Sequence, residues 1–394
     1  MKITDIRTVL LSCDYPAKER AVPGGMALRK HAALVQVFTD VGLTGLGEVG
    51  DGAFFPEGVG VFVERFKSLL VGEDPLLIER HWQRMYANAR YWGRRGLAIG
   101  VISGIEVALW DILGQAKGLP VYSLLGGKYH DRIKAYAGGL PKPREQLPAQ
   151  LKGYVDEGFT AVKIRIGLIF PGSGECEMEP RYDLERDREV VRVAREAIGD
   201  RVDLIVDAGQ GQAPQPWSAA RAIKVARMLE EYDVFWLEEP CGADDVQGYA
   251  AVAAAIEMPI AGGEGACTRW EFRELIQKKA LDIVQPDVTH AGGLLECKRI
   301  AALASASGIP VAPHCWGTGV GLMATLHFIA STPGCLIAEF SRVPYALREE
   351  LLVAPLLVEG GYIELPGVPG LGVELTEEIV HRYPFQPGLT WKPK

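Results

Sequence analysis

Three acidic side chains in the middle of the chain each end a short apolar segment rich in β-branched residues. They are Asp207 in DLIVDAG, Glu238 in VFWLEEP and Glu264 in PIAGGE. If these segments are successive parallel strands, their carboxylates meet at one edge of the sheet. Three converging carboxylates repel one another unless a hard cation lies between them, and oxygen ligands favour Mg²⁺ or Mn²⁺. We therefore expect one divalent ion per site, although any one of these acids taken alone could instead pair with a helix N-terminus.

Two cations lie on the segment AVKIRIG, which precedes the first of these acids. Lys163 and Arg165 are two residues apart, so on a strand both side chains point to the same side, here taken as the inside. Buried cations are costly without an anion nearby. The carboxylates and an anionic substrate would supply that charge. The alternative is a purely structural pair that neutralises the metal ligands.

A histidine and an acid end two later apolar segments. His314 ends PVAPHC, and Asp287 ends the preceding segment, DIVQPD. A carboxylate beside an imidazole fixes the tautomer and raises its basicity, so the two predict an acid/base pair, although most single histidines are structural. Glu339 ends CLIAEF and would face the substrate opposite the metal. His290 is interpreted as an ordinary loop residue.

The elements that carry these residues alternate between short apolar strands and amphipathic helices from about residue 131 onward. About eight such units predict a closed (β/α) barrel with the chemistry at the carboxyl ends of its strands. An open doubly wound sheet is the alternative, but it needs a glycine-rich phosphate turn after its first strand, and YAGGLPKP is not one. The segment 168–183 is an unusually long loop without an assigned role.

The flanking regions differ from the barrel in their patterns. Residues 1–50 alternate like an antiparallel meander, and 58–117 have helical spacing ending at Gly118. We predict three parts: an α+β capping domain over 1–125, the barrel over 126–340, and a segment over 341–394 that packs back on the capping domain. Glycine- and proline-rich loops at about 14–30 and 50–60 are predicted to be mobile and to close over the barrel mouth as specificity loops.

Composition limits the function further. The chain has 394 residues, 48% hydrophobic and 23% charged, with a net charge of −8 and no basic tract. These values disfavour nucleic acid as a partner, and no apolar run reaches the roughly 18 residues of a membrane helix. The N-terminus does not resemble a secretory signal, so we expect a cytoplasmic protein that forms a homo-oligomer.

The cysteines are interpreted as buried apolar residues in a reducing compartment. Their number is odd and no pair has C-x-x-C spacing. Cys315 is of interest because it follows His314. The seven are Cys13, Cys176, Cys241, Cys267, Cys297, Cys315 and Cys335.

Taken in order, KIRIG, VDAG, WLEEP, GGE, QPDV, APHCWGTG and AEF resemble the enolase superfamily, mandelate racemase subgroup. The resemblance extends to SGIEVALWDILGQAKG in the capping domain. It implies a (β/α)7β-type TIM barrel and a Mg²⁺-dependent enzyme that removes the proton α to a carboxylate and stabilises the enediolate. It also implies a role for each candidate: metal ligands (Asp207, Glu238, Glu264), acid/base pair (His314, Asp287), contact to the substrate carboxylate (Lys163) and hydrogen bond to the enediolate (Glu339).

Two departures from the family pattern limit the set of reactions that we expect. Arg165 stands where many members carry a second lysine that acts as a base, and a guanidinium is a poor base. Gly209 stands where some sugar-acid dehydratases carry an additional His or Asn. The PHCWGTGVG stretch is most similar to acid-sugar dehydratases and galactarolactone cycloisomerases. We expect dehydration of a sugar acid. The alternatives are opening of a sugar-acid lactone, epimerisation of a carboxylate, or a non-catalytic sugar-acid binding protein.

Overall fold

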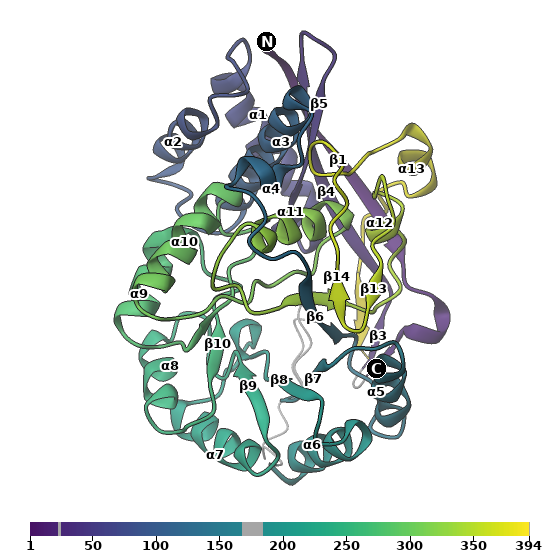
Figure 1. The fold of residues 1–394 in the computed structure, drawn as a ribbon, viewed down its shortest axis with the longest axis vertical. Coiled ribbons are helices and arrows are strands. Elements are labelled where there is room, and N and C mark those ends of the chain that lie inside the picture. Colours follow the sequence, from purple (N-terminus) through teal and green to yellow (C-terminus); the bar gives the residue numbers. More distant parts are fainter. Residues whose placement is uncertain (23–24, 168–183, 394) are drawn as a thin grey trace.

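The computed structural model describes residues 1–22, 25–167 and 184–393. The segment 168–183, predicted as a long loop, therefore lies outside the described residues. The N-terminal part begins with an antiparallel sheet in the order β1 (Ile3–Asp14), β4 (Arg29–Thr39) and β5 (Thr44–Val49). This sheet confirms the predicted meander. Helices α1 (Pro56–Leu70) and α3 (Leu97–Lys117) pack against it, and α2 (Ile78–Ala89) packs on these two helices (Figure 1).

Helix α3 lies directly on β5 because two strand glycines leave room for it. A Cβ atom at Gly47 would come within 1.8 Å of the Gly104 carbonyl oxygen, and one at Gly45 within 2.0 Å of the Ala108 carbonyl oxygen. Contrary to the sequence analysis, α3 is long and apolar enough to cross a membrane, but 83% of its apolar window is buried inside the protein. Among the described residues it is the one helix of this kind, and its burial is that of a core helix. It ends at Gly118 in the left-handed conformation, as predicted.

The two loops predicted over the barrel mouth contain more structure than expected. The first holds a 3₁₀ turn, Ala17–Glu19, and two short paired strands, β2 (Ala21–Val22) and β3 (Gly25–Ala27). The second consists of a 3₁₀ turn, Gly50–Ala53, and the start of α1 at Pro56. Both segments therefore contain secondary structure, while their mobility and their closure over the barrel mouth stay predictions. The cause of this additional structure is local: the extended strands β1 and β4 reach further than their alternation in the sequence indicates, and Pro56 starts a helix.

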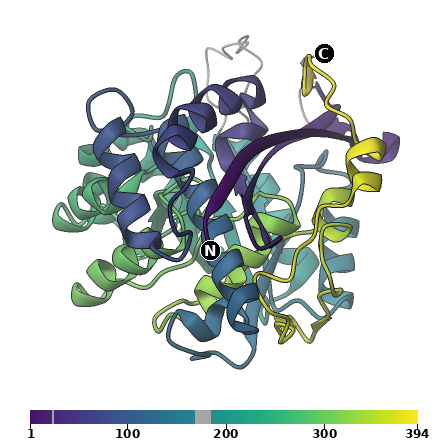
Figure 2. The same cartoon turned by 90° about the horizontal axis from the view of Figure 1, so that it is seen from above.

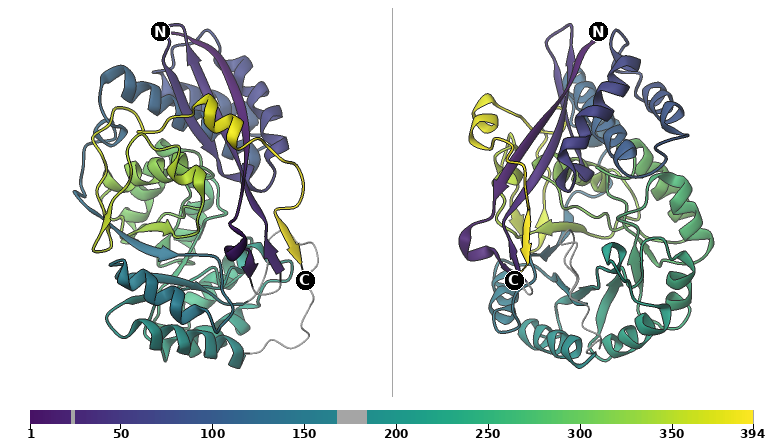
Figure 3. Two further views of the ribbon diagram at one scale, coloured as in Figure 1. Left: turned by 90° about the vertical axis from the view of Figure 1, so that its right-hand side faces the viewer. Right: turned by 180° about the vertical axis from the view of Figure 1, so that it is seen from behind.

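The second part is a ring of parallel strands surrounded by helices (Figures 1 and 3). Its ladders run in the order β11-β10-β9-β8-β7-β6, and β12 pairs in parallel with β6 on the other side. Between β11 and β12, isolated parallel bridges join Val284 to Val311 and Val311 to Cys335. The strands are β6 (Ile133–Gly138), β7 (Ala161–Arg165), β8 (Asp203–Asp207), β9 (Val234–Glu238), β10 (Ile260–Gly262), β11 (Ile283–Val284) and β12 (Ala338–Ser341).

Helices follow the strands one by one, as the alternating pattern predicted. The helices of the ring are α5 (Leu147–Asp156), α6 (Leu184–Ile198), α7 (Ala219–Glu230), α8 (Val246–Ala253), α9 (Thr268–Gln277), α10 (Leu294–Ala306) and α11 (Gly319–Ala330). A short helix, α4 (Val121–Leu124), and a 3₁₀ turn, Gln210–Gln212, lie in the connections. This arrangement is that of a (β/α)7β barrel beside an α+β capping domain.

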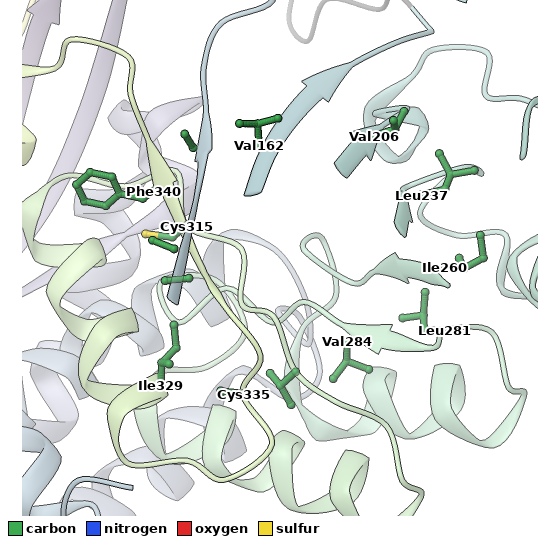
Figure 4. Packing of buried hydrophobic residues seen from close by; sticks show 14 of the residues in the cluster. Val162, Val206, Leu237, Ile260, Leu281, Val284, Cys315, Ile329, Cys335 and Phe340 are labelled. Atoms are coloured by element: carbon green, nitrogen blue, oxygen red, sulfur yellow. The ribbon is translucent and has the colours of Figure 1, made fainter. Parts of the chain in front are cut away.

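The interior of the ring is filled from every side. Eight buried residues form a single cluster; six lie in β6–β11, Ala312 follows the bridged Val311, and Ile337 directly precedes β12. They are Tyr136, Ala161, Ile205, Trp236, Ala261, Ile283, Ala312 and Ile337. Residues next to them in the strands, such as Val162, Val206 and Leu237, belong instead to the larger core that includes the helices (Figure 4). Because strand side chains alternate, Lys163 and Arg165 lie on the same inward side as Ala161.

The C-terminal residues return across both parts (Figures 2 and 3). Strand β14 (Tyr362–Ile363) pairs with β13 (Val358–Glu359) and with β6, and β15 (Trp391–Pro393) pairs with β3. Helix α13 (Glu377–Arg382) contributes Ile379 to a cluster with Leu11 of β1. The remaining short helix is α12 (Ala346–Glu349).

Buried carboxylates of the N-terminal part cap helices of the barrel. Glu106 of α3 accepts hydrogen bonds from the backbone N–H groups of Leu294 (2.8 Å) and Leu295 (2.9 Å) at the start of α10. Gly293, which precedes α10, provides no side-chain cap of its own. Glu48 likewise accepts from the N–H groups of Thr318 and Gly321 at the start of α11. The capping domain is thus joined to the barrel by carboxylates that accept hydrogen bonds from the free N–H groups at the starts of two barrel helices.

Glu106 gives a prediction about stability and pH. Burial raises the pKa of this carboxyl from 4.5 to about 7, although its hydrogen-bond donors oppose the shift. Its stabilising contribution is therefore complete below pH 4.5 and is lost as the pH rises through 7. The free energy of unfolding of the native protein, minus that of Glu106→Gln, should fall by about 3 kcal/mol between pH 4.5 and pH 8. Urea unfolding measures this difference, with the exposed Glu57→Gln as a control; a difference that stays constant with pH contradicts the account.

Candidate active site

Lys163 lies at the centre of the charged residues at the carboxyl ends of the strands. Its ammonium group is 2.8 Å from Glu238 Oε1 and 2.8 Å from Glu339 Oε1. Burial disfavours the charge, but these two carboxylates outweigh it and raise the pKa of Lys163 well above its usual value. Lys163 is therefore a permanent cation that connects β7, β9 and β12.

Arg165 binds the first of the predicted metal ligands. Its Nε and Nη2 atoms donate to Asp207 Oδ2 at 3.2 and 2.9 Å. The other oxygen of Asp207 accepts from the Gly209 N–H at 2.7 Å. Asp207 raises the pKa of Arg165 beyond its already high value. The guanidinium is thus held as a charged group and is not suited to accept a proton.

Glu238 and Glu264 have polar partners that fix their orientation. Glu238 Oε2 accepts from Gln285 Nε2 at 2.9 Å and from Trp236 Nε1 at 3.2 Å. Glu264 Oε1 accepts from Gln212 Nε2 at 3.2 Å. Burial raises the pKa of Glu264, and the charges of Asp207 and Glu238 raise it further. The three carboxylates are therefore close enough to repel one another.

A fourth carboxylate, which the sequence analysis did not single out, belongs to the same group. Glu239 has a positive φ of 47°, and its Oε2 is buried without a hydrogen-bond partner. Burial and the neighbouring charges of Glu264 and Asp207 raise its pKa well above the usual range. The doubled acid in WLEEP was the available signal, but strand alternation places only the first of the two acids on the inner side.

These features fit a divalent cation. Among the described residues no three His, Cys, Asp or Glu side chains are already arranged to hold a metal ion. Oxygens of the three expected ligands are instead paired with cationic side chains: Glu238 with Lys163, Asp207 with Arg165, and Glu264 with His314 at 3.6 Å. Oxygen donors that repel one another, together with the unpartnered oxygen of Glu239, form the donor set that a hard cation such as Mg²⁺ or Mn²⁺ prefers.

His314 and Asp287 form the predicted pair. His314 Nδ1 is 2.6 Å from Asp287 Oδ2, and Asp287 Oδ1 accepts from the N–H and the hydroxyl of Thr289 at 2.7 and 2.6 Å. Burial opposes ionisation of Asp287, but His314 and Thr289 lower the pKa of this carboxyl below its usual value. A carboxylate held in this way fixes the imidazole with Nε2 free to face a substrate.

The outer nitrogen of His314 points toward the carboxylates. Nε2 is 3.6 Å from Glu264 Oε2 and 4.0 Å from Glu339 Oε2. Burial alone would lower the pKa of His314, but Glu264, Glu339 and Asp287 together raise it to about 10. Glu339 Oε2 in turn accepts the Cys315 N–H at 2.9 Å. The structure thus brings all eight predicted site residues into one network.

A cavity of about 420 Å³ opens beside this network. Lys163 and Arg165 line it, together with Lys142, Arg144 and Arg186 and with Val22 of the capping domain. Lys142 is also paired with Glu19 at 2.7 Å, which ties the first loop of the capping domain to the barrel mouth. Two acids, Glu145 and Asp187, also line the cavity, and the five cations outnumber them, which suits an anionic ligand.

Comparison with known families identifies the protein class. Residues 15–126 match the mandelate racemase/muconate lactonizing enzyme N-terminal domain, and residues 146–379 match the enolase C-terminal domain-like family. The chain therefore belongs to the mandelate racemase/muconate lactonizing enzyme family of the enolase superfamily. Membership of this superfamily generally implies a divalent metal.

Individual relatives extend over almost the whole chain. D-galactarolactone cycloisomerase of Agrobacterium fabrum is 33% identical and is matched over 97% of this chain and 99% of the relative. Arabinonate dehydratase of Saccharolobus solfataricus is 34% identical with the same two coverages. Among solved structures, the 3,6-anhydro-D-galactonate cycloisomerase of Zobellia galactanivorans has a TM-score of 0.85 at 31% identity and covers 97% of this chain and 99% of its own.

Proposed function

We propose that this protein removes the α-proton of a sugar acid and then eliminates the β-hydroxyl, so that it acts as an acid-sugar dehydratase. The observation that carries the proposal is the His314–Asp287 pair, whose outer nitrogen faces the carboxylates at the barrel mouth. Imidazole is the one group in this network with an ordinary pKa near neutral pH. The similarity to arabinonate dehydratase supports the substrate class.

Asp207, Glu238 and Glu264 would hold one Mg²⁺, with Mn²⁺ as the alternative. When bound, the ion polarises the substrate carboxylate and stabilises the negative charge that develops on it. Glu264 is the strongest of the charges that raise the pKa of His314. Neutralising Glu264 would bring the imidazole nearer to the range in which it can accept a proton.

The chain's own residues then divide the remaining work. Lys163 binds the substrate carboxylate by charge, and His314 Nε2 takes the α-proton while Asp287 stabilises the resulting imidazolium. Glu339 would donate a hydrogen bond to the enediolate oxygen only when its carboxyl carries a proton; as the carboxylate paired with Lys163 it positions that ammonium group instead. The protonated His314 can return its proton to the departing hydroxyl. Arg165 serves as a charged clamp on Asp207 and on the substrate, since it is held protonated.

Opening of a sugar-acid lactone is the second candidate, and it uses the same proton abstraction with the ring oxygen as the leaving group. The similarity to D-galactarolactone cycloisomerase favours it. Epimerisation is less well supported, because it needs a second base on the opposite face of the substrate. The position on β7 where many family members carry such a base is occupied by Arg165. A protein that only binds sugar acids would not need the His314–Asp287 pair.

A substrate screen separates these candidates. Mono- and diacid sugars and their lactones would be incubated with the Mg²⁺-loaded protein, and products followed by proton NMR. We expect a 2-keto-3-deoxy acid from an open-chain acid. Turnover of lactones alone would identify the activity as that of a cycloisomerase and not of a dehydratase. Inversion at the α-carbon without loss of water would contradict both assignments.

A further inference from the structure

A second cluster of reactive side chains lies outside the network described above. Cys267 Sγ is 3.2 Å from His290 Nε2, and His290 Nδ1 is 3.0 Å from Asp51 Oδ2. The three residues come from the loop before α9, the loop before α10 and the 3₁₀ turn of the capping domain. The sequence analysis interpreted His290 as an ordinary loop residue and Cys267 as a buried apolar residue. The structure instead joins them into a thiol–imidazole–carboxylate series.

The sulfur also receives stabilisation from backbone groups. Gly96 N–H donates to Cys267 Sγ at 3.3 Å, and Cys267 directly precedes the ten-residue helix α9. Negative charge is favoured at a helix N-terminus, and a thiolate there is also stabilised by an adjacent imidazolium. The Cys267 N–H itself is taken by Glu271 Oε2 at 2.7 Å. The Cys267 side chain makes no hydrogen bond to the N–H groups of α9, and its sulfur also lies 3.8 Å from the His290 carbonyl oxygen.

The charged groups that face the cluster favour a proton on the imidazole. Burial opposes a charge on His290, but Cys267 and Asp51 outweigh it and raise the pKa of His290 well above its usual value. Arg95 contributes positive charge next to Cys267 and is itself paired with Glu271 and Asp244, each at 2.9 Å. Asp51, with one oxygen on Nδ1, is the counter-ion that holds the imidazole ring.

The other described thiols lack such an environment. Burial raises the pKa of Cys241, Cys315 and Cys335 to about 12. It raises that of Cys297 well above the usual value and also raises that of Cys13. No hydrogen bond from a histidine to any of these five is found in the described part of the chain. Cys267 is thus distinguished by its contacts, although its side chain is buried like theirs.

We propose that Cys267 and His290 form a thiolate–imidazolium pair, oriented by Asp51, that reacts with small hydroperoxides. The thiolate sulfur attacks one peroxide oxygen, the O–O bond breaks, and His290 gives its proton to the leaving oxygen. Hydrogen peroxide thereby becomes water and Cys267 becomes a sulfenic acid. Cys267 itself is fully buried, whereas the side chains of His290 and Asp51 are 17% and 20% exposed, so a small reagent would have to enter beside these two residues. This proposal does not depend on the sugar-acid reaction.

Thiolate absorbance near 240 nm tests the ion pair without the need for a reagent. The difference spectrum between the native protein and Cys267→Ser should show about one thiolate per chain at pH 7. The signal should be much weaker in His290→Asn, which removes the imidazolium. Cys297→Ser is the matched control for a buried cysteine and should leave the spectrum unchanged. Equal spectra of the native protein and Cys267→Ser at pH 7 would overturn the proposal.

Trapping tests the reaction itself. The folded native protein is treated with stoichiometric hydrogen peroxide and dimedone, and the labelled peptides are identified by mass spectrometry. We expect the label on Cys267, at least 10-fold above that on Cys297, and a loss of this preference in His290→Asn. A label absent from Cys267, or spread evenly over the cysteines, would overturn the assignment even if the thiolate were observed.

Discussion

Replacing His314 with asparagine should reduce the rate of α-proton removal by roughly 10²- to 10⁴-fold, the usual contribution of one general base. Asparagine retains the size and a hydrogen bond to Asp287 but accepts no proton at neutral pH. The Lys163 contacts with Glu238 and Glu339 do not involve His314. Substrate binding should therefore change far less than kcat. Steady-state kinetics with the substrate found in the screen, together with calorimetric binding, would measure both quantities.

His381 provides the control for this substitution. It lies on α13 and is exposed, so His381→Asn changes the same residue type away from the barrel mouth. We expect native kinetics in this variant. If His314→Asn and His381→Asn are equally active, His314 is not the base, and the roles assigned to the network must be revised.

Removal of divalent metal should lower activity by roughly 10³-fold or more, because a bound cation supplies several kcal/mol of stabilisation to the developing charge. Treatment with EDTA should abolish turnover, and Mg²⁺ should restore it. Calorimetry should find one Mg²⁺ per chain. Glu264→Gln should weaken that binding, because it removes one of the three repelling carboxylates that the cation would join.

The exposed Glu257 provides the matched control for the Glu264→Gln substitution. Glu257→Gln removes the same charge outside the barrel mouth and should bind Mg²⁺ like the native protein. Full activity after metal stripping, verified by elemental analysis, would contradict the proposed metal site. Unchanged Mg²⁺ affinity in Glu264→Gln would exclude Glu264 as a ligand.

The barrel and its network were predictable because several apolar strand segments end in, or are directly followed by, a residue whose type is costly to bury. Asp207, Glu238 and His314 follow apolar runs, and strand periodicity then decides which side they face. Parallel pairing of successive strands brings the ends together whatever the loops do. The chemistry at the strand ends therefore follows from local patterns and one topological rule.

Long-range contacts were not predictable in this way. The pairing of β15 with β3 joins residues near opposite ends of the chain, and no local pattern encodes it. The same holds for Glu106, which reads as one acid in an apolar helix but caps α10. Cys267, His290 and Asp51 come from three separate segments, so their contact becomes visible only in the folded structure.

Exchange of the α-proton with solvent tests the central claim most directly. The native protein, His314→Asn and Arg165→Met would each be incubated with Mg²⁺ and the sugar acid in D₂O, and deuterium at the α-carbon of substrate and product followed by NMR. We predict incorporation by the native protein and by Arg165→Met, and little or none by His314→Asn. Exchange at the native rate in His314→Asn, with none in Arg165→Met, would contradict the account and make the cation on β7 the base.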